Sequence, residues 1–447
     1  MAAIGSSDRL EETSPLGILA GGSAVPMELA DAVIRRGRSV HIVGIEGEAE
    51  AGIAGYPHTW VNWGGIGAMI SALQAARCRQ LVIVGRVCRP NLLALRPDFG
   101  FWRSIPALLP FLKGGDDTIL RLVVGFFERH GLEVIGAHEA APELLATPGP
   151  LGRHMPSREQ LAEASYAASA LRLIGPFDAA QAAVVGAGGL VAIEGADGTD
   201  AMLRRLADRP RLDAAGSVLV KLPKPAQERR IDMPAIGPDT VLRAAEAGLA
   251  GIAVGAGATL VAERADVVRE ADAGGLFVVG LDEADMSAQP IEHDLDAESD
   301  LAALSPVEAL GAIGHLKAAQ RHLADAEVAA HLLSSLTPFW PRACTVVSRG
   351  YVLATEGPGG ALGIAERVGR LKPWGARRLH RRTGVLVISE LDGELGPDPG
   401  ALIVKAKASG LAGLAVLRSP RDEAGLAMLT MAADRAGLFV LAPGRAL

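Results

Sequence analysis

Cysteine is scarce in this chain. Its 447 residues include three cysteines, Cys78, Cys88 and Cys344, an odd number at wide spacing. A disulfide framework or a CxxC metal site cannot be built from them, because both require paired cysteines at suitable spacings. The cysteine content therefore predicts a protein of a reducing compartment, the cytoplasm.

Long apolar runs are also missing. Hydrophobic residues make up 49% of the chain, yet no segment reaches the roughly 18 uncharged apolar residues that a membrane-spanning helix needs. The first residues, MAAIGSSDRLEETSP, contain acidic side chains and lack the apolar core of a secretion signal. We therefore expect neither secretion nor a membrane span.

Basic residues form no long cluster. The chain has 44 Lys and Arg against 51 Asp and Glu, a net charge of −7, and this balance predicts that nucleic acid is not a partner. One phosphate pocket is still compatible with it, because backbone amides and one or two cations are sufficient to bind a phosphate. The GxGxxG spacing is absent from AGGSAVP after the first strand, so a dinucleotide cofactor is not expected.

Short Val/Ile/Leu strands alternate with alanine-rich helices along the chain, which predicts an α/β fold with mainly parallel sheets. We expect two α/β domains, an acidic linker and a third α/β segment, at 1–150, 151–285, 286–301 and 302–447. In the first domain we expect strands at 16–22, 39–44, 81–84 and 132–135, and helices at 26–36, 66–77 and 117–131. In the second we expect strands at 182–185, 190–193, 218–222, 251–254 and 276–279, and helices at 159–173, 200–207 and 240–247.

The third segment repeats parts of the second domain. VAIEG ending near Glu194 matches LATEG near Glu356, LAGIAV at 249 matches LAGLAV at 411, and GLFVV at 275 matches GLFVL at 437. An internal repeat explains these matches. The second copy carries ISELDGELGPDP where the first has KLPKPAQERRIDMPAIGPDT, so we expect a degenerate copy that serves packing, oligomerisation or regulation rather than chemistry.

Two glycine turns follow expected strands. Gly21-Gly22-Ser23 precedes a helix, where backbone N–H groups and the helix dipole favour an anion such as a nucleotide phosphate; a tight turn with positive φ explains the glycines equally well. Gly85-Arg86 follows the strand at 81–84, at the edge where open α/β sheets bind ligands. Arg86 either binds a phosphate there or forms a surface ion pair.

Acidic residues begin two of the expected helices. Asp116-Asp117 can cap the following helix or ligate a hard cation such as Mg2+, and Asp117 is our candidate ligand. Thr199 and Asp200 follow a strand within EGADGTD. An Asx turn with an N-cap explains this second pattern structurally, and substrate binding explains it functionally.

Charged residues are dense after the strand at 218–222. The candidates are Lys221, Lys224, Gln227, Arg229, Arg230 and Asp232. Pyrophosphate cleavage needs cations on the phosphoryl oxygens, a metal, and a carboxylate that holds the metal or orients water. This loop is therefore the best candidate for an active site, with Lys221, Gln227, Arg230 and Asp232 as catalytic residues; a solvated basic loop is the bland alternative.

An apolar segment, FGFWRSIPALLPFL at 99–112, is interrupted by prolines. It is either core or the wall of a groove for acyl chains.

At these residues the chain resembles the UDP-2,3-diacylglucosamine pyrophosphatase family of the LpxI type. The matching stretches are GILAGGSAVPMELA, GDDTILR at 115, FDAAQAAVV at 177, EGADGTDAMLRR at 194 and KLPKPAQERRIDMPAIGPDT at 221. They follow one another in order through both expected domains, so the resemblance is far more specific than any single motif.

The resemblance implies a reaction and a site. Water would attack the α-phosphorus of the UDP-sugar and give UMP and 2,3-diacylglucosamine 1-phosphate (lipid X) in lipid A biosynthesis, with Mg2+ or another hard divalent cation. Asp232 matches the family's essential aspartate and would bind the metal or activate water. The groups implied to hold nucleotide or sugar phosphate, in a cleft between the two domains, are Gly21, Gly22, Ser23, Gly85, Arg86, Thr199, Asp200, Lys221 and Lys224.

The resemblance also implies partners and a location. The substrate is a lipid-linked UDP-sugar, so the protein would work at the cytoplasmic face of the inner membrane and contact it transiently. The family is associated with a homodimer, whereas the attached repeat could cover the dimer surface and leave the chain monomeric. The alternative functions are hydrolysis of another nucleotide-diphospho-sugar and non-catalytic sensing of a nucleotide sugar.

Overall fold

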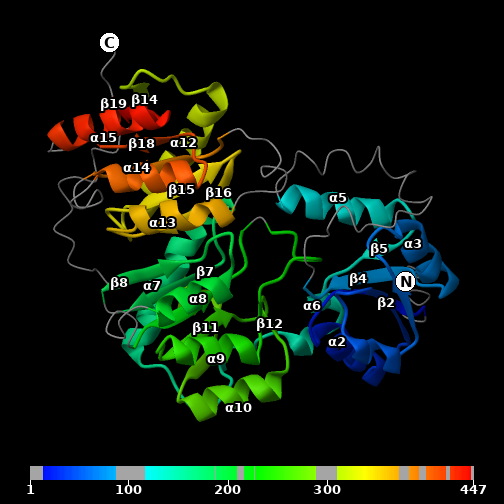
Figure 1. The fold of residues 1–447 in the computed structure, drawn as a ribbon. Helices are drawn as coiled ribbons and strands as arrows, with labels where there is room; N and C mark the ends of the chain where they lie inside the picture. Colours follow the sequence, from blue (N-terminus) through cyan, green and yellow to red (C-terminus); the bar gives the residue numbers. More distant parts are fainter. Residues whose placement is uncertain are drawn as a thin grey trace, which may run out of the picture. The chain divides into compact units, whose positions relative to one another are not determined.

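The computed structural model of the chain describes residues 14–86, 116–186, 188–208, 216–225, 227–287, 310–371, 382–391, 399–418 and 423–443 (Figure 1). The chain divides into two compact units. The first contains residues 1–152, 227–241 and 254–273, and the second contains 153–226, 242–253 and 274–447. Both units combine parallel-rich sheets with helices, so the predicted α/β class is confirmed.

The first unit contains a five-stranded parallel sheet in the order β3-β2-β1-β4-β5. Its strands are β1 (Leu16–Ala20), β2 (Val40–Ile45), β3 (His58–Val61), β4 (Gln80–Val84) and β5 (Glu133–Val134). Its helices are α2 (Val25–Arg35), α3 (Ile66–Ala75), α5 (Asp116–Glu128) and α6 (Ala137–Ala140), with short 3-10 turns η1 (Ala51–Gly55) and η3 (Pro142–Leu144) and a two-residue strand β6 (Gly149–Pro150).

The two faces of this sheet carry separate hydrophobic clusters. Alternate residues of β1 explain the separation, because successive side chains of a strand point to opposite faces. Ile18 belongs to the cluster that includes Leu29 and Val33 of α2, and Leu19 belongs to the cluster that includes Met69 and Leu73 of α3. The sheet is therefore buried on both sides, as parallel sheets generally are.

Later parts of the chain complete the first unit. The strands β10 (Ala235–Ile236) and β12 (Leu260–Val261) form a parallel pair, followed by helix α10 (Arg264–Gly274). Ile231 packs against the Leu19 cluster, whereas Met233 packs against the Ile18 cluster on the other face. Asp232 therefore lies where the chain passes from one face of the N-terminal sheet to the other.

The second unit contains two lobes. The first lobe consists of residues 153–226, 242–253 and 274–287. Its sheet runs in the order β13-β11-β9-β7-β8, with β7 antiparallel to both neighbours. The strands are β7 (Ala182–Gly186), β8 (Gly189–Ile193), β9 (Val218–Lys221), β11 (Gly251–Gly255) and β13 (Phe277–Leu281). The helices are α7 (Arg158–Ile174), α8 (Thr199–Ala207), α9 (Pro238–Glu246) and α11 (Glu283–Ser287), with the 3-10 turn η4 (Gly175–Phe177).

The rest of the second unit is the C-terminal lobe, residues 310–443. Its sheet runs in the order β14-β19-β18-β17-β15-β16, with β15 antiparallel to both neighbours. The strands are β14 (Leu310–Ala312), β15 (Cys344–Ser348), β16 (Tyr351–Glu356), β17 (Val385–Ile388), β18 (Gly413–Val416) and β19 (Phe439–Pro443). The helices are α12 (Gln320–Leu336), α13 (Ala361–Arg367), α14 (Pro399–Ala408) and α15 (Glu423–Ala436), with the 3-10 turn η7 (Val368–Arg370).

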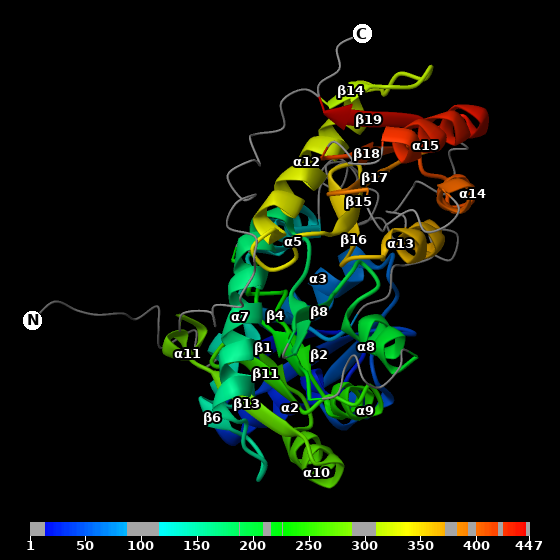
Figure 2. The same ribbon diagram turned by 90° about the vertical axis from the view of Figure 1, so that its left-hand side faces the viewer.

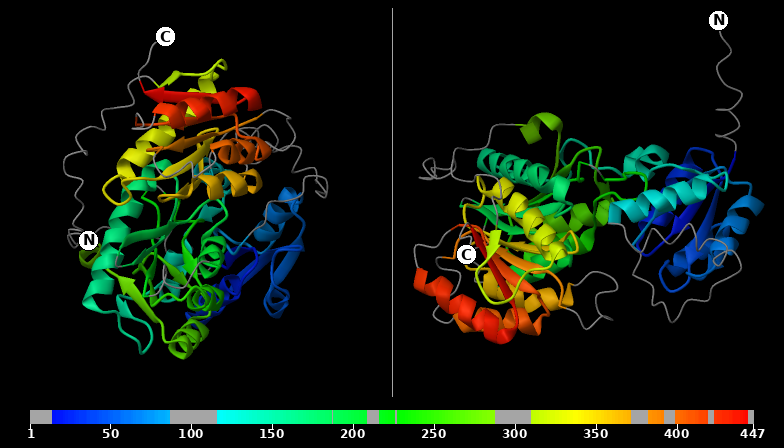
Figure 3. Two further views of the ribbon diagram at one scale, coloured as in Figure 1. Left: turned by 60° about the vertical axis from the view of Figure 1, so that its left-hand side comes forward. Right: turned by 90° about the horizontal axis from the view of Figure 1, so that it is seen from above.

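The two lobes share one hydrophobic core. A single cluster of buried side chains includes Ala167 and Leu171 of α7 together with Ala329 and Leu333 of α12. The two helices are in contact, and Figures 2 and 3 show α12 in yellow next to α7 in teal. The second unit is therefore one packed body built from two similar sheets.

Candidate functional site

The glycine turns predicted from the sequence meet at one point of the N-terminal sheet. Gly21 N–H donates to Val84 O (3.0 Å), and Gly22 and Arg86 exchange two backbone hydrogen bonds of 2.6 Å each. These residues follow β1 and β4, the two central strands from which the chain winds outward in opposite directions. Open α/β sheets bind ligands outside the carboxyl ends of the strands at this topological switch point.

The backbone conformation of the turns requires small residues. Gly85 has φ of +103°, and a Cβ added to it would lie 2.8 Å from the Gly21 carbonyl carbon. A Cβ on Gly22 would lie 3.0 Å from Glu48 O at the end of β2. Ser23 adopts φ of 114° just before α2, although positive φ is costly for residues other than glycine. The glycines therefore bring three chain segments close together where a ligand can approach the backbone.

A second group of predicted residues gathers at one edge of the first lobe. Lys221 is the last residue of β9, is buried, and pairs with Ala182 at the start of β7. Glu194, after β8, accepts hydrogen bonds from Gln181 N–H (3.0 Å) and from the Thr199 hydroxyl (2.6 Å). Lys221, Glu194 and Thr199 therefore surround the first residues of β7.

Ion pairs fix two more predicted residues at this edge. Lys224 pairs with Asp178, a residue held in a left-handed conformation with φ of 52°. Asp200 lies 3.8 Å from the Arg243 guanidinium. Asp178 and Arg243 were not predicted as site residues, because their partners Lys224 and Asp200 are far along the chain. Glu194 was not predicted as a site residue either, although it begins the EGADGTD pattern and its partner Thr199 follows five residues later.

The turn that carries Asp232 has its own hydrogen bonds. Gln227 Nε2 donates to Asp232 Oδ2 (2.6 Å), and Asp232 N–H donates to Glu228 O (2.9 Å). The turn thereby presents one carboxylate, oriented by a side-chain amide. This is the arrangement that a metal ligand or an acceptor for a water proton requires.

Arg230 is held by two carboxylates. It donates to both oxygens of Glu228 (2.8 and 2.9 Å) and to Glu128 at the end of α5 (3.0 Å). Its hydrogen bonds to Glu228 raise the pKa of Arg230, and the same pair lowers the pKa of Glu228. The arrangement favours a structural cation that ties the Asp232 turn to α5.

The charged loop predicted as one site is divided between the two units. Lys221 and Lys224 belong to the second unit, whereas Gln227, Arg230 and Asp232 belong to the first. The side chain of Asp117 and the apolar segment at 99–112 lie outside the described residues, as does most of the predicted linker at 286–301. The predicted domain boundaries and site roles remain predictions.

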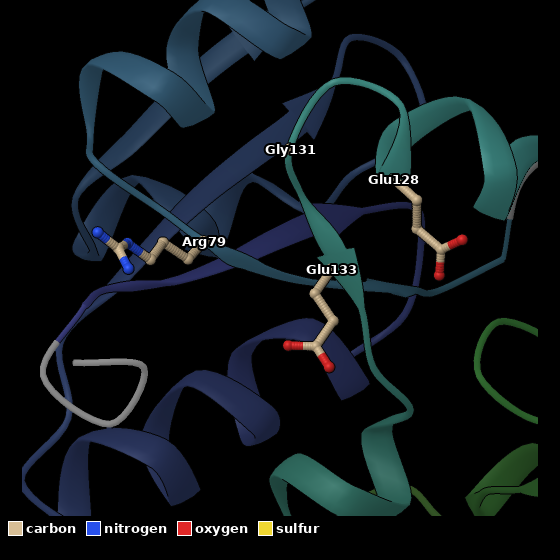
Figure 4. Close-up of a pocket in the computed structure, with 4 residues that line it drawn as sticks. All are labelled: Arg79, Glu128, Gly131 and Glu133. Carbon is tan, nitrogen blue, oxygen red and sulfur yellow. The ribbon is translucent and has the colours of Figure 1, made fainter. Parts of the chain in front are cut away.

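An open depression in the first unit is lined by none of the predicted site residues, although Glu128 at its edge accepts a hydrogen bond from Arg230. It is lined by Arg79, Glu128, Gly131 and Glu133, at the start of β4 and β5 rather than at the carboxyl ends of the strands. Its charged side chains point in different directions rather than toward one centre (Figure 4). Nothing in this arrangement resembles a catalytic site.

The described residues also bear on the predicted metal ion and membrane contact. Within that part of the chain, no three His, Cys, Asp or Glu side chains are grouped so that they could hold a metal ion. The described helices are all too short or too polar to cross a bilayer.

The sequence matches known proteins over the first two thirds of the chain. Residues 15–144 match the model of the LpxI N-terminal domain, and residues 147–279 match that of the LpxI C-terminal domain. One relative, the UDP-2,3-diacylglucosamine pyrophosphatase LpxI of Caulobacter vibrioides, is 42% identical over 272 residues. That alignment covers 60% of this chain and 97% of the relative. The matched domain models end at residue 279, before the C-terminal lobe begins.

The match corrects the predicted reaction. Water attack on the α-phosphorus, with release of UMP and 2,3-diacylglucosamine 1-phosphate, is one specific course of hydrolysis. The domain models and the relative's name identify LpxI and a pyrophosphatase, and they do not support this particular site of attack or these products. The predicted course of hydrolysis is therefore not retained. The matched domains and the near-complete coverage of the relative establish that the chain belongs to the LpxI family.

Proposed function

We propose that this protein is a UDP-2,3-diacylglucosamine pyrophosphatase, a hydrolase of lipid A biosynthesis. The observation that carries the proposal is the alignment with the Caulobacter enzyme, which spans 97% of that relative at 42% identity. The parts that match the two domain models, residues 15–144 and 147–279, include both glycine turns, the Lys221 edge and the Asp232 turn. The geometry supports the same function, because each of these features suits a phosphate-bearing substrate.

The first unit would bind part of the diphosphate or nucleotide at its switch point. The amides of Gly21 and Gly22 are hydrogen-bonded within the turn, so the N–H groups offered to an anion would be those that follow at the start of α2, whose N-cap residue Ala24 provides no side-chain cap. An anion is favoured at such a helix start by the unsatisfied N–H groups and the helix dipole. Gly85 allows the close approach of β4, and Arg86 adds a cation at the same point.

The second unit would contribute the buried edge around β7. Lys221 supplies a positive charge in a position of low exposure, where its attraction to a phosphoryl oxygen is screened less than at the surface. Lys224, Thr199 and Asp200 would bind polar groups of the substrate. Glu194 orients the Thr199 hydroxyl through their 2.6 Å hydrogen bond.

Asp232 is the proposed catalytic carboxylate. Its Oδ2 accepts the hydrogen bond of Gln227, which fixes the carboxylate plane. Mg2+ is commonly held by one or two carboxylates plus substrate phosphates and water, so a single described aspartate fits such an ion, with Asp117 as a second proposed ligand. The ion would neutralise charge on the phosphoryl oxygens. Arg230 would position the turn through Glu228 and Glu128.

We further propose that the C-terminal lobe is a duplicate of the first lobe that has lost the site. Lys221 and Ile388 both end a strand and both pair with the first residue of the neighbouring antiparallel strand, Ala182 or Cys344. The glycine N-caps of α8 and α13 are followed by Thr199 and Ala361 respectively. The groups proposed to bind substrate are thus replaced by apolar residues in the second copy.

A lipid-bearing substrate also has consequences for location. Its acyl chains would remain in the bilayer while the UDP-sugar enters the site, so we propose transient contact of the protein with the cytoplasmic face of the inner membrane.

The test is turnover of UDP-2,3-diacylglucosamine by the full chain in water enriched in heavy oxygen, with Mg2+ or with a chelator. We expect hydrolysis that requires the ion and that falls about 100-fold or more in Asp232→Asn, because general acid–base or metal-ligand groups contribute effects of this size. Asp266→Asn, which alters an exposed ion pair with Arg269 in the same unit, is the control and should keep full activity. The labelled product identifies the phosphorus that water attacks.

No turnover by the unaltered chain would instead favour a nucleotide-sugar sensor. Turnover that Asp232→Asn leaves unchanged would remove Asp232 from the chemistry.

A further inference from the structure

Most equivalent positions of the two lobes of the second unit are separated by the same number of residues. Phe177 and Phe339, Glu194 and Glu356, and Phe277 and Phe439 are each 162 positions apart. The irregularity of register in the β7–β8 pair lies between Val184 and Val185, and that of the β15–β16 pair lies between Val346 and Val347, again 162 positions later. The lobes therefore share local irregularities as well as strand order.

Equivalent elements of the lobes pack against each other. Helix α7 contacts α12, its counterpart, and strand β8 contacts β16, its counterpart. The Tyr166 ring of α7 lies 4.7 Å from the Phe339 ring, and the Tyr166 hydroxyl donates to Pro338 O (3.3 Å). Pairing of the same surface patch with itself defines the isologous interface of a twofold dimer. Within one chain, this contact has the form of a dimer whose subunits are covalently joined.

The interface reaches residues 194–200, a segment that ends with Thr199 and Asp200 at the start of α8 and that we call the loop at 194–200. Ala196 N–H donates to Leu353 O of β16 (2.9 Å), and a Cβ added to Gly195 would lie 3.0 Å from the same oxygen. This is a direct backbone hydrogen bond between the C-terminal lobe and the loop at 194–200. A displacement of β16 must therefore displace the loop or break the bond.

Four charged side chains surround the same contact. In the first lobe Arg205 pairs with Asp197, and in the C-terminal lobe Arg367 Nη2 lies 2.6 Å from Glu356 Oε1. Burial is the main cause of a lowered pKa for Arg367, and the charges of Glu356, Arg205 and Asp197 act on it as well. Arg367 therefore holds the last residue of β16, three positions after Leu353, whose carbonyl accepts the hydrogen bond from the loop.

We propose that the C-terminal lobe is a built-in second subunit whose function is to hold the loop at 194–200 in its binding conformation, through Leu353 and Arg367. Arg367 is a positioning residue, because it acts on the loop and not on the substrate. The effect on substrate rests on the proposed function, whereas the effect on the loop does not. The lobe has lost its own site residues and kept the interface, which is the outcome expected if the interface is its function.

The experiment compares three variants of the full chain by amide hydrogen exchange of peptides covering residues 194–200. Arg367→Gln removes the buried charge, and Arg367→Lys keeps it. Glu366→Gln is the matched control, since Glu366 is the adjacent residue of α13 but pairs with the exposed Lys405 (2.9 Å). We expect exchange in the loop to be about fivefold faster in Arg367→Gln, the size of a typical coupling energy between sites. Arg367→Lys and Glu366→Gln should exchange like the unaltered chain.

Steady-state kinetics of the same variants provide a second test of the proposal. Looser positioning of Thr199 and Asp200 should raise KM for the UDP-sugar about fivefold in Arg367→Gln with kcat nearly unchanged. A folded Arg367→Gln whose loop exchanges at the unaltered rate would overturn the inference. If that variant does not fold, the same measurement is made on Glu356→Gln, which removes the partner carboxylate of Arg367. The expected increase in loop exchange is again about fivefold. If the unaltered chain shows no turnover but Arg367→Gln still exchanges faster in the loop, the proposed function is rejected and the role of the C-terminal lobe stands.

Discussion

In the first lobe β9 ends on Lys221, whereas in the C-terminal lobe β17 ends on Ile388, and both residues have the same pairing with a neighbouring strand. The N-termini of α8 and α13 show the same contrast, with Thr199 and Asp200 in one and Ala361 and Leu362 in the other. The buried strands, by comparison, keep a Val-Leu-Val sequence in β9 and in β17. The comparison teaches that the chemical positions of a scaffold can change while its packing positions are kept, since Ile388 joins the core of the C-terminal lobe at the position where Lys221 places a charge.

The largest expected effect comes from giving the first lobe the residue of the second. Lys221→Ile should lower turnover about 100-fold or more, because removal of one preorganised charge or donor from an active site has effects of this size. The fold should persist, since isoleucine already occupies the equivalent buried position. Turnover and thermal unfolding of the same sample measure both effects.

Lys405→Ile is a suitable control, because it changes an exposed lysine of the C-terminal lobe to the same residue. Activity of Lys221→Ile within twofold of that control would show that the difference between the lobes is not chemical.

The next expected effect is on stability and not on turnover, and it comes from the aromatic residues at the lobe interface. Phe339 is buried against Tyr166, whereas its counterpart Phe177 is only partly buried. Phe339→Ala should lower the free energy of unfolding by about 3–5 kcal/mol, the usual cost of removing a buried phenylalanine, and Phe177→Ala by clearly less. Urea unfolding followed by circular dichroism compares them. Equal costs would contradict the unequal burial and hence the contact with Tyr166.

The smallest effect concerns the buried acids of α7 and α12. Burial raises the pKa of Glu163, and the neighbouring Glu159 raises it further, so the folded protein binds this proton more tightly than the unfolded chain. The stability that protonation of Glu163 provides is therefore present below the ordinary carboxyl pKa and is lost as pH rises through the raised value.

Glu163→Gln should accordingly be more stable than the unaltered chain at pH 7, and this advantage should vanish near pH 4. The counterpart Asp325 accepts a hydrogen bond from Gly350 N–H (2.7 Å), so Asp325→Asn should be slightly destabilising at pH 7. Melting temperatures measured from pH 4 to 8 would show whether the two substitutions have opposite signs as expected.

The fold was largely predictable from local pattern. The expected strand at 81–84 and helix at 66–77 correspond to β4 and α3 within a few residues, because apolar periodicity reports burial directly. The predictions missed β10 and β12, which have two residues each. Such short strands are stabilised by tertiary packing and leave no periodic pattern.

The candidate site was predictable only in part. The two glycine turns could be placed together, because the carboxyl ends of neighbouring parallel strands meet at one edge. The positioning role of Arg230 could not be predicted, because its partner Glu128 precedes it by 102 residues. The division of the charged loop between two units was equally hidden, because sequence proximity does not reveal which body a residue packs against.

The late pieces of the first unit have a consequence for biosynthesis. The ribosome makes β1 to β5 early, but residues 227–241 and 254–273 of the same unit emerge after β7 to β9 of the other. Ile231 and Met233 therefore reach the two core clusters of the N-terminal sheet late in translation. Part of the apolar surface of the nascent N-terminal unit therefore stays uncovered until a stretch of its neighbour has been synthesised, and surface exposed in this way is prone to aggregation.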